Sequence, residues 1–247
     1  QDLLRWGASL ARRLYARVSR GNVVLFAAPV RRKLSLHTRV VLLTTAVLLV
    51  LGAAVLLAVE EPPGGRGRAI GRTNLGDVRL NDWQATDYPQ RLRTAAFHSV
   101  SARTAGFNTM DMAQLSDAGK LWMCMLMSIG GSPAGTAGGM KTVTFALLLV
   151  TLWSQLRLRD EVETLRRSVA REVIYKGVTV AVLYLMLLGL VTLALCVAMR
   201  PGYAFVDLLF EACSACGTVG LSTGVTPSLT IPGKYILVFG MFAGRLG

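Results

Sequence analysis

Long apolar runs without charge alternate with polar interruptions along this chain. Residues 40–59 and 177–199 carry no charged side chain, and each is about as long as a helix must be to cross a bilayer, roughly 20 residues. Two shorter apolar stretches, 121–129 and 143–153, flank a glycine-rich run at 130–139. We interpret these two stretches as one membrane helix that is interrupted at its middle.

Two further stretches, 92–102 and 204–215, are predicted to form helices too short to span a membrane. Each runs into a short loop that has neither the period-2 alternation of a strand nor the charge of a surface loop. The loops are Thr104-Ala105-Gly106-Phe107-Asn108 and Thr218-Val219-Gly220-Leu221-Ser222. A last apolar helix is predicted from residue 236 and is cut off after Gly247.

The order of helix, short helix, loop and helix therefore occurs twice, in residues 36–153 and 175–247. This repeat is one of topology, and the two copies share little sequence. We predict an all-α membrane protein made of two such units, joined by a charged connector at 154–174.

Charge sets the expected orientation. The chain is 53% hydrophobic and only 17% charged, with a net charge of +13, and its mean hydropathy is +0.49. The basic residues concentrate beside apolar runs, above all in residues 1–39, whereas residues 60–93 are nearly balanced. The positive-inside rule then puts the N-terminus and the 154–174 connector in the cytoplasm, in a cell membrane. Such placement favours anionic lipid headgroups over nucleic acid as the partner.

The basic segment at 1–35 has two interpretations that the sequence leaves open. It has the spacing of an amphipathic helix lying on the cytoplasmic face, or it is a solvated linker that only sets topology. The four cysteines lie in apolar surroundings, which argues against a disulfide framework. No metal-ligand cluster or catalytic triad is visible in the sequence, so we expect no enzyme.

The two loops carry the chemistry. A monovalent cation inside a bilayer needs oxygens in place of its hydration shell, and backbone carbonyls supply them without a fixed charge. Presenting successive carbonyls requires conformations that glycine reaches freely, and Gly106 and Gly220 stand at the loop centres. The short helices would aim their partly negative C-terminal ends at the loops, which favours a cation there.

Several motifs together resemble the Trk/Ktr/HKT superfamily of potassium transporters, and most closely the bacterial Ktr-type membrane subunit in its C-terminal half. The motifs are Leu34–Thr38, Ser99–Thr109, Gly130–Thr142, Gly217–Ser222 and Phe242–Gly247. The resemblance implies one pore built from four helix–pore loop–helix units. This sequence matches the third and fourth, with the fourth truncated in its last helix.

The resemblance also implies roles for individual residues. The ion-binding filter would be lined by Thr104, Ala105, Gly106, Phe107, Thr218, Val219, Gly220 and Leu221. The break at 130–141 would be the intramembrane gate, and the gating residues would be Gly130, Gly131, Gly135, Gly138, Gly139, Lys141 and Arg245. An uncharged run precedes Arg245, which predicts burial of its side chain within the membrane.

Ions and partners follow from the same resemblance. Potassium is the expected ion, and sodium is the second candidate, either co-transported in symport or merely activating. No covalently bound cofactor is expected. The implied assembly is a homodimer that binds a cytosolic ring of nucleotide-binding regulatory subunits.

Other interpretations remain beside this one. The broken helices could serve packing in a non-conducting regulatory or scaffold protein of the membrane. A weaker alternative is a membrane nucleotide hydrolase, because Gly135 and Lys141-Thr142 match the ends of a P-loop, although Met140 occupies the place of a required glycine.

Charged residues near the short helices also have two interpretations. Asp207 and Glu211 would attract cations to the outer mouth, or lie near headgroups without a role. His98 and Arg103 are expected to brace the first loop. Lys141 is either a positive barrier facing the pore, which we favour, or a side chain reaching the inner interface.

Overall fold

The computed structural model describes residues 36–60, 88–132, 135, 137–157, 163–164, 167–168, 171–199 and 202–246. The fold below is that of these residues. The predicted basic segment at 1–35 and most of the charge-balanced stretch at 60–93 lie outside them.

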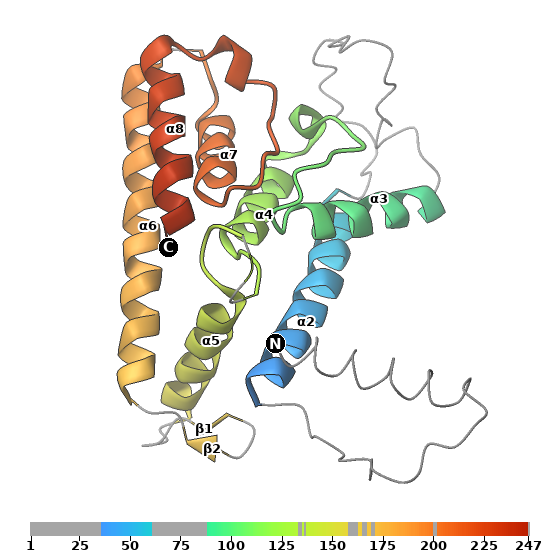
Figure 1. Ribbon diagram of the computed structural model, residues 1–247. Coiled ribbons are helices and arrows are strands. Elements are labelled where there is room, and N and C mark those ends of the chain that lie inside the picture. The colour runs from blue at the N-terminus through green and yellow to red at the C-terminus, as the bar shows by residue number, and fades with distance from the viewer. Residues whose placement is uncertain are drawn as a thin grey trace, which may run out of the picture.

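Both predicted units are present as helices (Figure 1). The first contains α2 (Leu36–Val59), α3 (Tyr88–Ser101), a 3₁₀ turn (Met112–Gln114), α4 (Asp117–Ser128) and α5 (Thr142–Leu156). The second contains α6 (Arg171–Ala198), α7 (Phe205–Cys216), a 3₁₀ turn (Thr226–Ser228) and α8 (Ile231–Leu246). The described chain is helical apart from a two-residue antiparallel ladder between β1 (Glu163–Thr164) and β2 (Arg167–Ser168).

Element boundaries differ from the prediction where capping decides them. α8 begins at Ile231 rather than 236, because the Thr230 hydroxyl accepts a hydrogen bond from the Gly233 amide (3.3 Å) and caps the first turn. α6 begins at Arg171, inside the predicted 154–174 connector, and the small ladder in that connector was not predicted. α5 continues three residues beyond the predicted end at 153.

α2 and α6 have the length and composition of membrane spans. The spans Thr38–Val59 and Arg171–Ala198 each contain an 18-residue stretch with a mean hydropathy of 2.8 and 2.7, of which only 22% and 28% is buried. α5 is apolar but shorter. Exposed large side chains such as Leu183, Leu185 and Met186 follow α6. A soluble protein rarely exposes so large an apolar surface, so these faces belong in hydrocarbon or against further protein.

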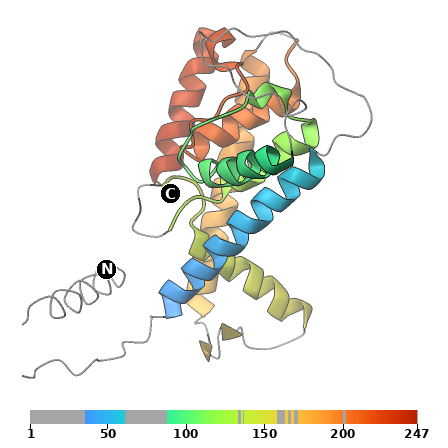
Figure 2. The ribbon, with the colours of Figure 1, turned by 90° about the vertical axis from the view of Figure 1, so that its right-hand side faces the viewer.

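Of the two short helices, α7 is enclosed by other helices, whereas α3 lies at the edge of the described chain (Figure 1). α7 packs on α4, α6 and α8, and α3 packs on α2, as the two perpendicular views show (Figures 1 and 2). α7 is buried at every position from Phe210 to Cys216. Two apolar clusters form around it, one toward α2 and α4 and one toward α6 and α8.

An ion pair joins the two units. Lys120 at the start of α4 donates to Asp207 at the start of α7, with an Nζ–Oδ1 distance of 2.7 Å. The two side chains are 9% and 22% exposed. Asp207 is therefore paired with a cation on α4, a contact that the sequence did not predict.

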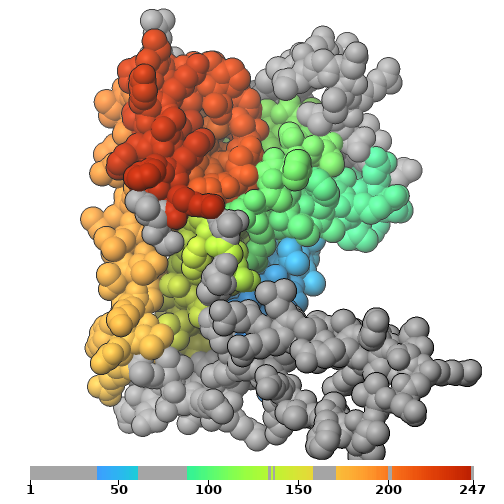
Figure 3. Space-filling view, viewed as in Figure 1, coloured from blue at the N-terminus to red at the C-terminus, as the bar shows by residue number. Residues whose placement is uncertain are grey.

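α4 and α5 are the two halves of the interrupted helix, and residues 129–141 form the break between them. Figure 1 shows α4 in the upper half of the molecule and α5 in the lower half, with the end of α8 beside the break. In the space-filling view, the yellow-green surface of this segment lies below the red end of α8 (Figure 3). The predicted interruption of a single helix is thus present.

Candidate functional site

The two predicted loops have matching backbones. Thr104 and Gly106 have φ angles of +68° and +75°, and Thr218 and Gly220 have φ angles of +52° and +96°. Positive φ is uncommon for threonine, a β-branched residue. Both loops therefore place a left-handed residue at every second position, an arrangement that turns successive peptide units toward one side.

The loops also meet in space, although 114 positions separate them in the sequence. A Cβ atom built on Gly106 would overlap the carbonyl oxygen of Val219. One built on Gly220 would lie 3.8 Å from the Gly106 Cα atom, an ordinary contact. The close approach at Gly106 therefore requires glycine, whereas Gly220 requires it for conformation alone.

The amides of both loops point back to the helix that precedes them. After α3, the amides of Ala105 and Gly106 donate to the Ser101 carbonyl at 3.0 and 3.2 Å. After α7, the Val219 amide donates to the Ser214 carbonyl (2.9 Å) and the Gly220 amide to the Ser214 hydroxyl (3.2 Å). These bonds fix the loops to the C-terminal ends of the short helices.

In the first loop the Phe107 carbonyl accepts a hydrogen bond from the Ser101 hydroxyl, whereas the carbonyl oxygens at the centres of both loops have no partner within the described residues. Among the described residues, no hydrogen bond reaches the carbonyl oxygens of Thr104, Ala105, Gly106, Thr218, Val219 or Gly220. Gly220 and Ala105 are exposed, and Thr104, Gly106 and Thr218 are half-buried. Phe107 is 71% exposed and Leu221 is buried. The six carbonyl oxygens of residues 104–106 and 218–220 are thus unpaired, while most amides of these two segments are paired.

Side chains brace the far ends of the loops. Glu211 on α7 is buried, and its Oε1 accepts from the Ser222 hydroxyl (2.6 Å) and the Thr223 amide (3.0 Å). Its Oε2 accepts from the Thr226 hydroxyl (2.6 Å). The sequence placed Glu211 at an outer mouth or near headgroups, and no spacing signal indicated this bracing. In the first loop, buried His98 bonds the Thr109 hydroxyl (3.2 Å), as predicted for a brace.

The break at 129–141 folds back on itself. The Gly130 amide donates to the Met140 carbonyl (2.8 Å), and the Met140 amide donates to the Ser128 carbonyl (3.1 Å). A Cβ on Gly130 would overlap the Gly138 carbonyl oxygen, so the two sides of the break touch through their backbones. Gly139 has a positive φ of +72°.

The other predicted gating residues of the break are Gly131, Gly135 and Lys141. Gly135 is exposed and Gly131 is half-buried. Lys141 directs its ammonium into the break, where Nζ donates to the Ala137 carbonyl (2.6 Å). It therefore faces the break and does not extend away from it to an interface.

Arg245 does not pack into the core of the described chain, and its predicted depth within the membrane stays a prediction. Its side chain is exposed in the described chain rather than buried. The preceding residue explains this orientation: Gly244 is the position of α8 that packs on α7, so closely that a Cβ there would overlap the Cys216 carbonyl oxygen. The next residue along a helix points about 100° away. The backbone at this place does reach the break, since the Gly139 amide donates to the Gly244 carbonyl (3.3 Å).

Two side chains fasten the break to the loops. The Thr218 hydroxyl accepts from the Gly138 amide (3.0 Å), and Arg103 donates through Nη2 to the Gly130 carbonyl (2.9 Å). The sequence predicted that Arg103 would brace its loop. The structure instead connects it to the break.

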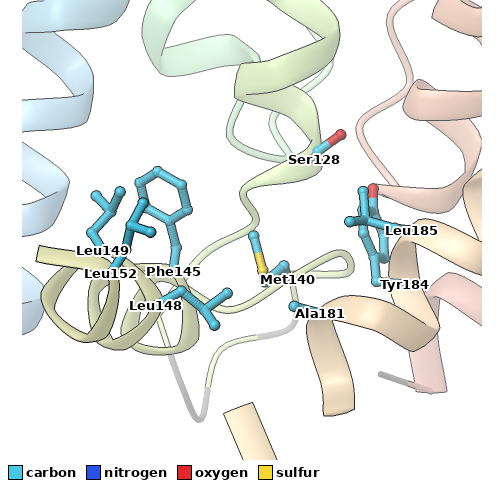
Figure 4. Close-up of a pocket in the computed structure, with 9 residues that line it drawn as sticks. All are labelled: Ser128, Met140, Phe145, Leu148, Leu149, Leu152, Ala181, Tyr184 and Leu185. Atoms are coloured by element: carbon cyan, nitrogen blue, oxygen red, sulfur yellow. The ribbon is translucent and has the colours of Figure 1, made fainter. Parts of the chain in front are cut away.

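An apolar cavity of about 200 Å³ lies beside the break, between α5 and α6. Figure 4 shows the side chains that line it, with Met140 of the break between Phe145 on α5 and Tyr184 on α6. The full lining is Ser128, Met140, Phe145, Leu148, Leu149, Leu152, Ala181, Tyr184 and Leu185. Met140 therefore has open space on one side.

The sequence has relatives among known proteins. Residues 13–247 match the family described as "TrkH: Cation transport protein". The chain is 33% identical over 230 residues to Ktr system potassium uptake protein B of Bacillus subtilis. This match covers 92% of this chain and 48% of that protein. It is 32% identical over 226 residues to the potassium/sodium uptake protein NtpJ of Enterococcus hirae, covering 87% of this chain and 45% of NtpJ.

A solved structure has the same fold. The potassium transporter TrkH of Vibrio parahaemolyticus superposes with a TM-score of 0.59 at 18% identity, covering 85% of this chain and 42% of that one. The chain spans about half the length of the relatives it matches. The family match over residues 13–247, together with the repeated units and paired loops, gives the assignment: this chain belongs to the TrkH family of cation transport proteins.

Proposed function

We propose that this chain supplies half of a path that carries potassium into the cell, with the Thr104–Phe107 and Thr218–Leu221 loops as its filter. The observation that carries the proposal is the contrast within both loops. The amides of Ala105, Gly106, Thr218, Val219 and Gly220 are paired to the short helices, while the carbonyl oxygens of residues 104–106 and 218–220 are unpaired within the described residues, and the two loops meet at Gly106 and Val219. Carbonyl oxygens at such positions replace the hydration shell of a cation.

The chemistry favours a monovalent cation. The loops present dipoles without a fixed negative charge, and the C-terminal ends of α3 and α7 add a partial negative potential. A membrane potential alone supplies about 2.3 kcal/mol per charge for each 100 mV. The names of the relatives include both potassium uptake and potassium/sodium uptake. Potassium is the proposed ion, and sodium is its proposed coupled or activating ion.

The break at 130–141 is the proposed gate. Irregular backbone at membrane depth is tolerated where it is buried in protein or lines water, and this break lies against both loops. The Lys141 ammonium inside the break would repel cations approaching from below the loops. Arg245, exposed at the end of α8, adds a second positive charge on that route.

Assembly and orientation complete the proposal. We place the N-terminus and the 154–174 connector in the cytoplasm of a cell-membrane protein. The partners are a second copy of the protein, anionic lipids, and a cytosolic ring of nucleotide-binding regulatory subunits.

Growth of a potassium-uptake-deficient bacterium tests the function. The complete protein should restore growth at low external potassium, and purified protein in liposomes should take up rubidium. A correctly inserted protein that does neither would favour the non-conducting scaffold. ATP hydrolysis that is lost in Lys141→Ala would instead support the hydrolase.

A further inference from the structure

One serine in each short helix stands at the same place relative to its loop. Ser101 is the last residue of α3, Ser214 lies in the last turn of α7, and both side chains are buried. The carbonyl of each serine accepts loop amides, as described above. Each serine also follows by three residues the side chain that braces the far end of its loop, His98 in the first unit and Glu211 in the second. The two serines are therefore equivalent positions of the repeated unit.

The hydroxyl groups of the two serines contact opposite kinds of backbone group. The Ser214 hydroxyl accepts a hydrogen bond from the Gly220 amide (3.2 Å), whereas the Ser101 hydroxyl donates to the Phe107 carbonyl. The spacing differs by one residue, since Ser214 lies six positions before Gly220 and Ser101 lies five before Gly106. The Ser101 hydroxyl thus meets the residue after the loop glycine, and the Ser214 hydroxyl meets the glycine itself.

Each of these bonds fixes the direction of a whole peptide unit. The amide and the carbonyl of a trans peptide group point in opposite directions. Because the Gly220 amide is held against α7, the Val219 carbonyl of the same peptide unit points away from α7, and it lies against Gly106 of the first loop. In the first loop it is the carbonyl of Phe107 that is turned back to the short helix.

We propose that Ser101 and Ser214 are positioning residues that decide which carbonyl oxygens of the two loops can bind the transported cation. Ser214 turns the Val219 carbonyl toward the ion path, and Ser101 withdraws the Phe107 carbonyl from it. Among the described residues, no hydrogen bond reaches the Leu221 carbonyl, so the second loop offers one oxygen more than the first. This inference rests on the proposed function, because it assigns the ion contacts of the proposed filter.

Two other serines provide matched controls. Ser99 is buried like Ser101 and lies on the same helix, but its hydroxyl donates to the Leu49 carbonyl on α2 (2.8 Å). In the second unit, the Ser228 hydroxyl donates to the Val225 carbonyl (2.7 Å), beyond the second loop. Alanine at either control position removes one hydrogen bond of a hydroxyl without releasing a peptide group of the loops.

The test of Ser214 measures rubidium uptake by the complete protein in liposomes, with potassium and sodium as competitors. In Ser214→Ala the Gly220 amide loses its partner, so the Val219 carbonyl is free to rotate away from the ion path. We expect the KM for rubidium to rise and the potassium-over-sodium preference to fall, each by about 2–10-fold, the factor that one neutral hydrogen bond contributes. Ser228→Ala should leave both unchanged. If Ser214→Ala does not fold, Ser214→Cys keeps the volume with a weaker acceptor, and the same direction of change is expected.

Ser101→Ala should change the KM in the opposite direction. Loss of this hydroxyl frees the Phe107 carbonyl, which can then add its oxygen to those that line the ion path. We expect the KM for rubidium to fall by about 2–10-fold, whereas Ser99→Ala should leave it unchanged. A rise in the KM of folded Ser101→Ala would show that the hydroxyl only supports the loop, and would overturn the withdrawal of Phe107.

The ion contacts themselves give a second readout. In crystals of the complete wild-type protein with thallium, the ion should reach the Leu221 carbonyl oxygen, while the Phe107 carbonyl stays paired to Ser101. In Ser101→Ala crystals, thallium should also contact the Phe107 carbonyl oxygen. Contact between thallium and Phe107 in the wild-type protein would overturn the proposal.

The outcomes separate the role of the serines from the function. If the wild-type protein takes up rubidium but folded Ser214→Ala has the KM and ion preference of Ser228→Ala, the positioning role is wrong and the transport proposal stands. An equal KM in Ser101→Ala and Ser99→Ala likewise refutes the role of Ser101 alone. If the wild-type protein takes up no rubidium, the proposed function itself fails.

Discussion

Substitution of Gly220 by serine tests whether the second loop sets ion preference. Gly220 has a φ angle of +96°, and a Cβ there meets nothing closer than the Gly106 Cα atom at 3.8 Å. The side chain therefore fits in this chain. Serine is strained by the positive φ angle, because its Cβ atom disfavours the left-handed conformation. Relief of this backbone strain would rotate the peptide units that carry the Val219 and Gly220 carbonyl oxygens.

The size of the effect follows from the conformational cost. A left-handed conformation costs a residue with a Cβ about 1–2 kcal/mol relative to glycine. If the loop relaxes by turning a carbonyl away from the path, up to that free energy is lost from the binding of the preferred ion. At about 1.4 kcal/mol per factor of ten, the potassium-over-sodium preference should fall by about 5–30-fold.

The assay is competition of sodium against rubidium uptake by the complete protein. Gly224→Ser is the matched control, because Gly224 also has a positive φ (+87°) and open space around it but lies beyond the loop. It should carry a similar conformational cost and leave the preference unchanged. Unchanged preference in a folded, active Gly220→Ser protein, or an equal loss in Gly224→Ser, would refute the reasoning.

The remaining predictions concern stability and are read from thermal unfolding of the complete protein in detergent. Gly106→Ala should lower the midpoint more than Gly220→Ser does, because its Cβ overlaps the backbone of the second loop; an equal midpoint would argue against direct contact of the loops. Glu211→Gln should destabilise by about 1–3 kcal/mol, since a buried acceptor becomes a donor facing hydroxyls; no change would remove its bracing role. Lys120→Met leaves Asp207 unpaired and should cost about 3 kcal/mol; Asp207→Leu in the same protein should recover part of this loss, and a further drop would contradict the pairing.

The helices and their repeat were predictable because membrane length, uncharged runs and glycine interruptions leave a strong signal in sequence. The two loops were predictable because each glycine follows a short helix at the same place in two repeated units, although a glycine taken alone more often serves helix packing or a turn. The start of α8 was missed because it depends on one hydroxyl, that of Thr230. The ladder between β1 and β2 involves two residues on each side, too few to produce a periodic pattern.

The connections within the site were beyond sequence reasoning. Thr218 and Gly138 lie 80 positions apart, and Arg103 and Gly130 lie 27 apart, so no spacing rule relates them. Glu211 stands in an apolar stretch, but the sequence does not show that its partners are the hydroxyls of Ser222 and Thr226 and the amide of Thr223. Hydropathy placed Arg245 at membrane depth, but it does not register which face of α8 packs on α7, so it could not indicate that this side chain faces away from α7.

The most direct measurement is the position of a heavy monovalent cation in the complete protein. Crystals grown with thallium or rubidium should show anomalous density at coordination distance from the carbonyl oxygens of Thr104 to Gly106 and of Thr218 to Gly220. The ion should lie between the two loops. Cation density elsewhere in the protein, with these oxygens facing lipid or a dry side-chain core, would contradict the account.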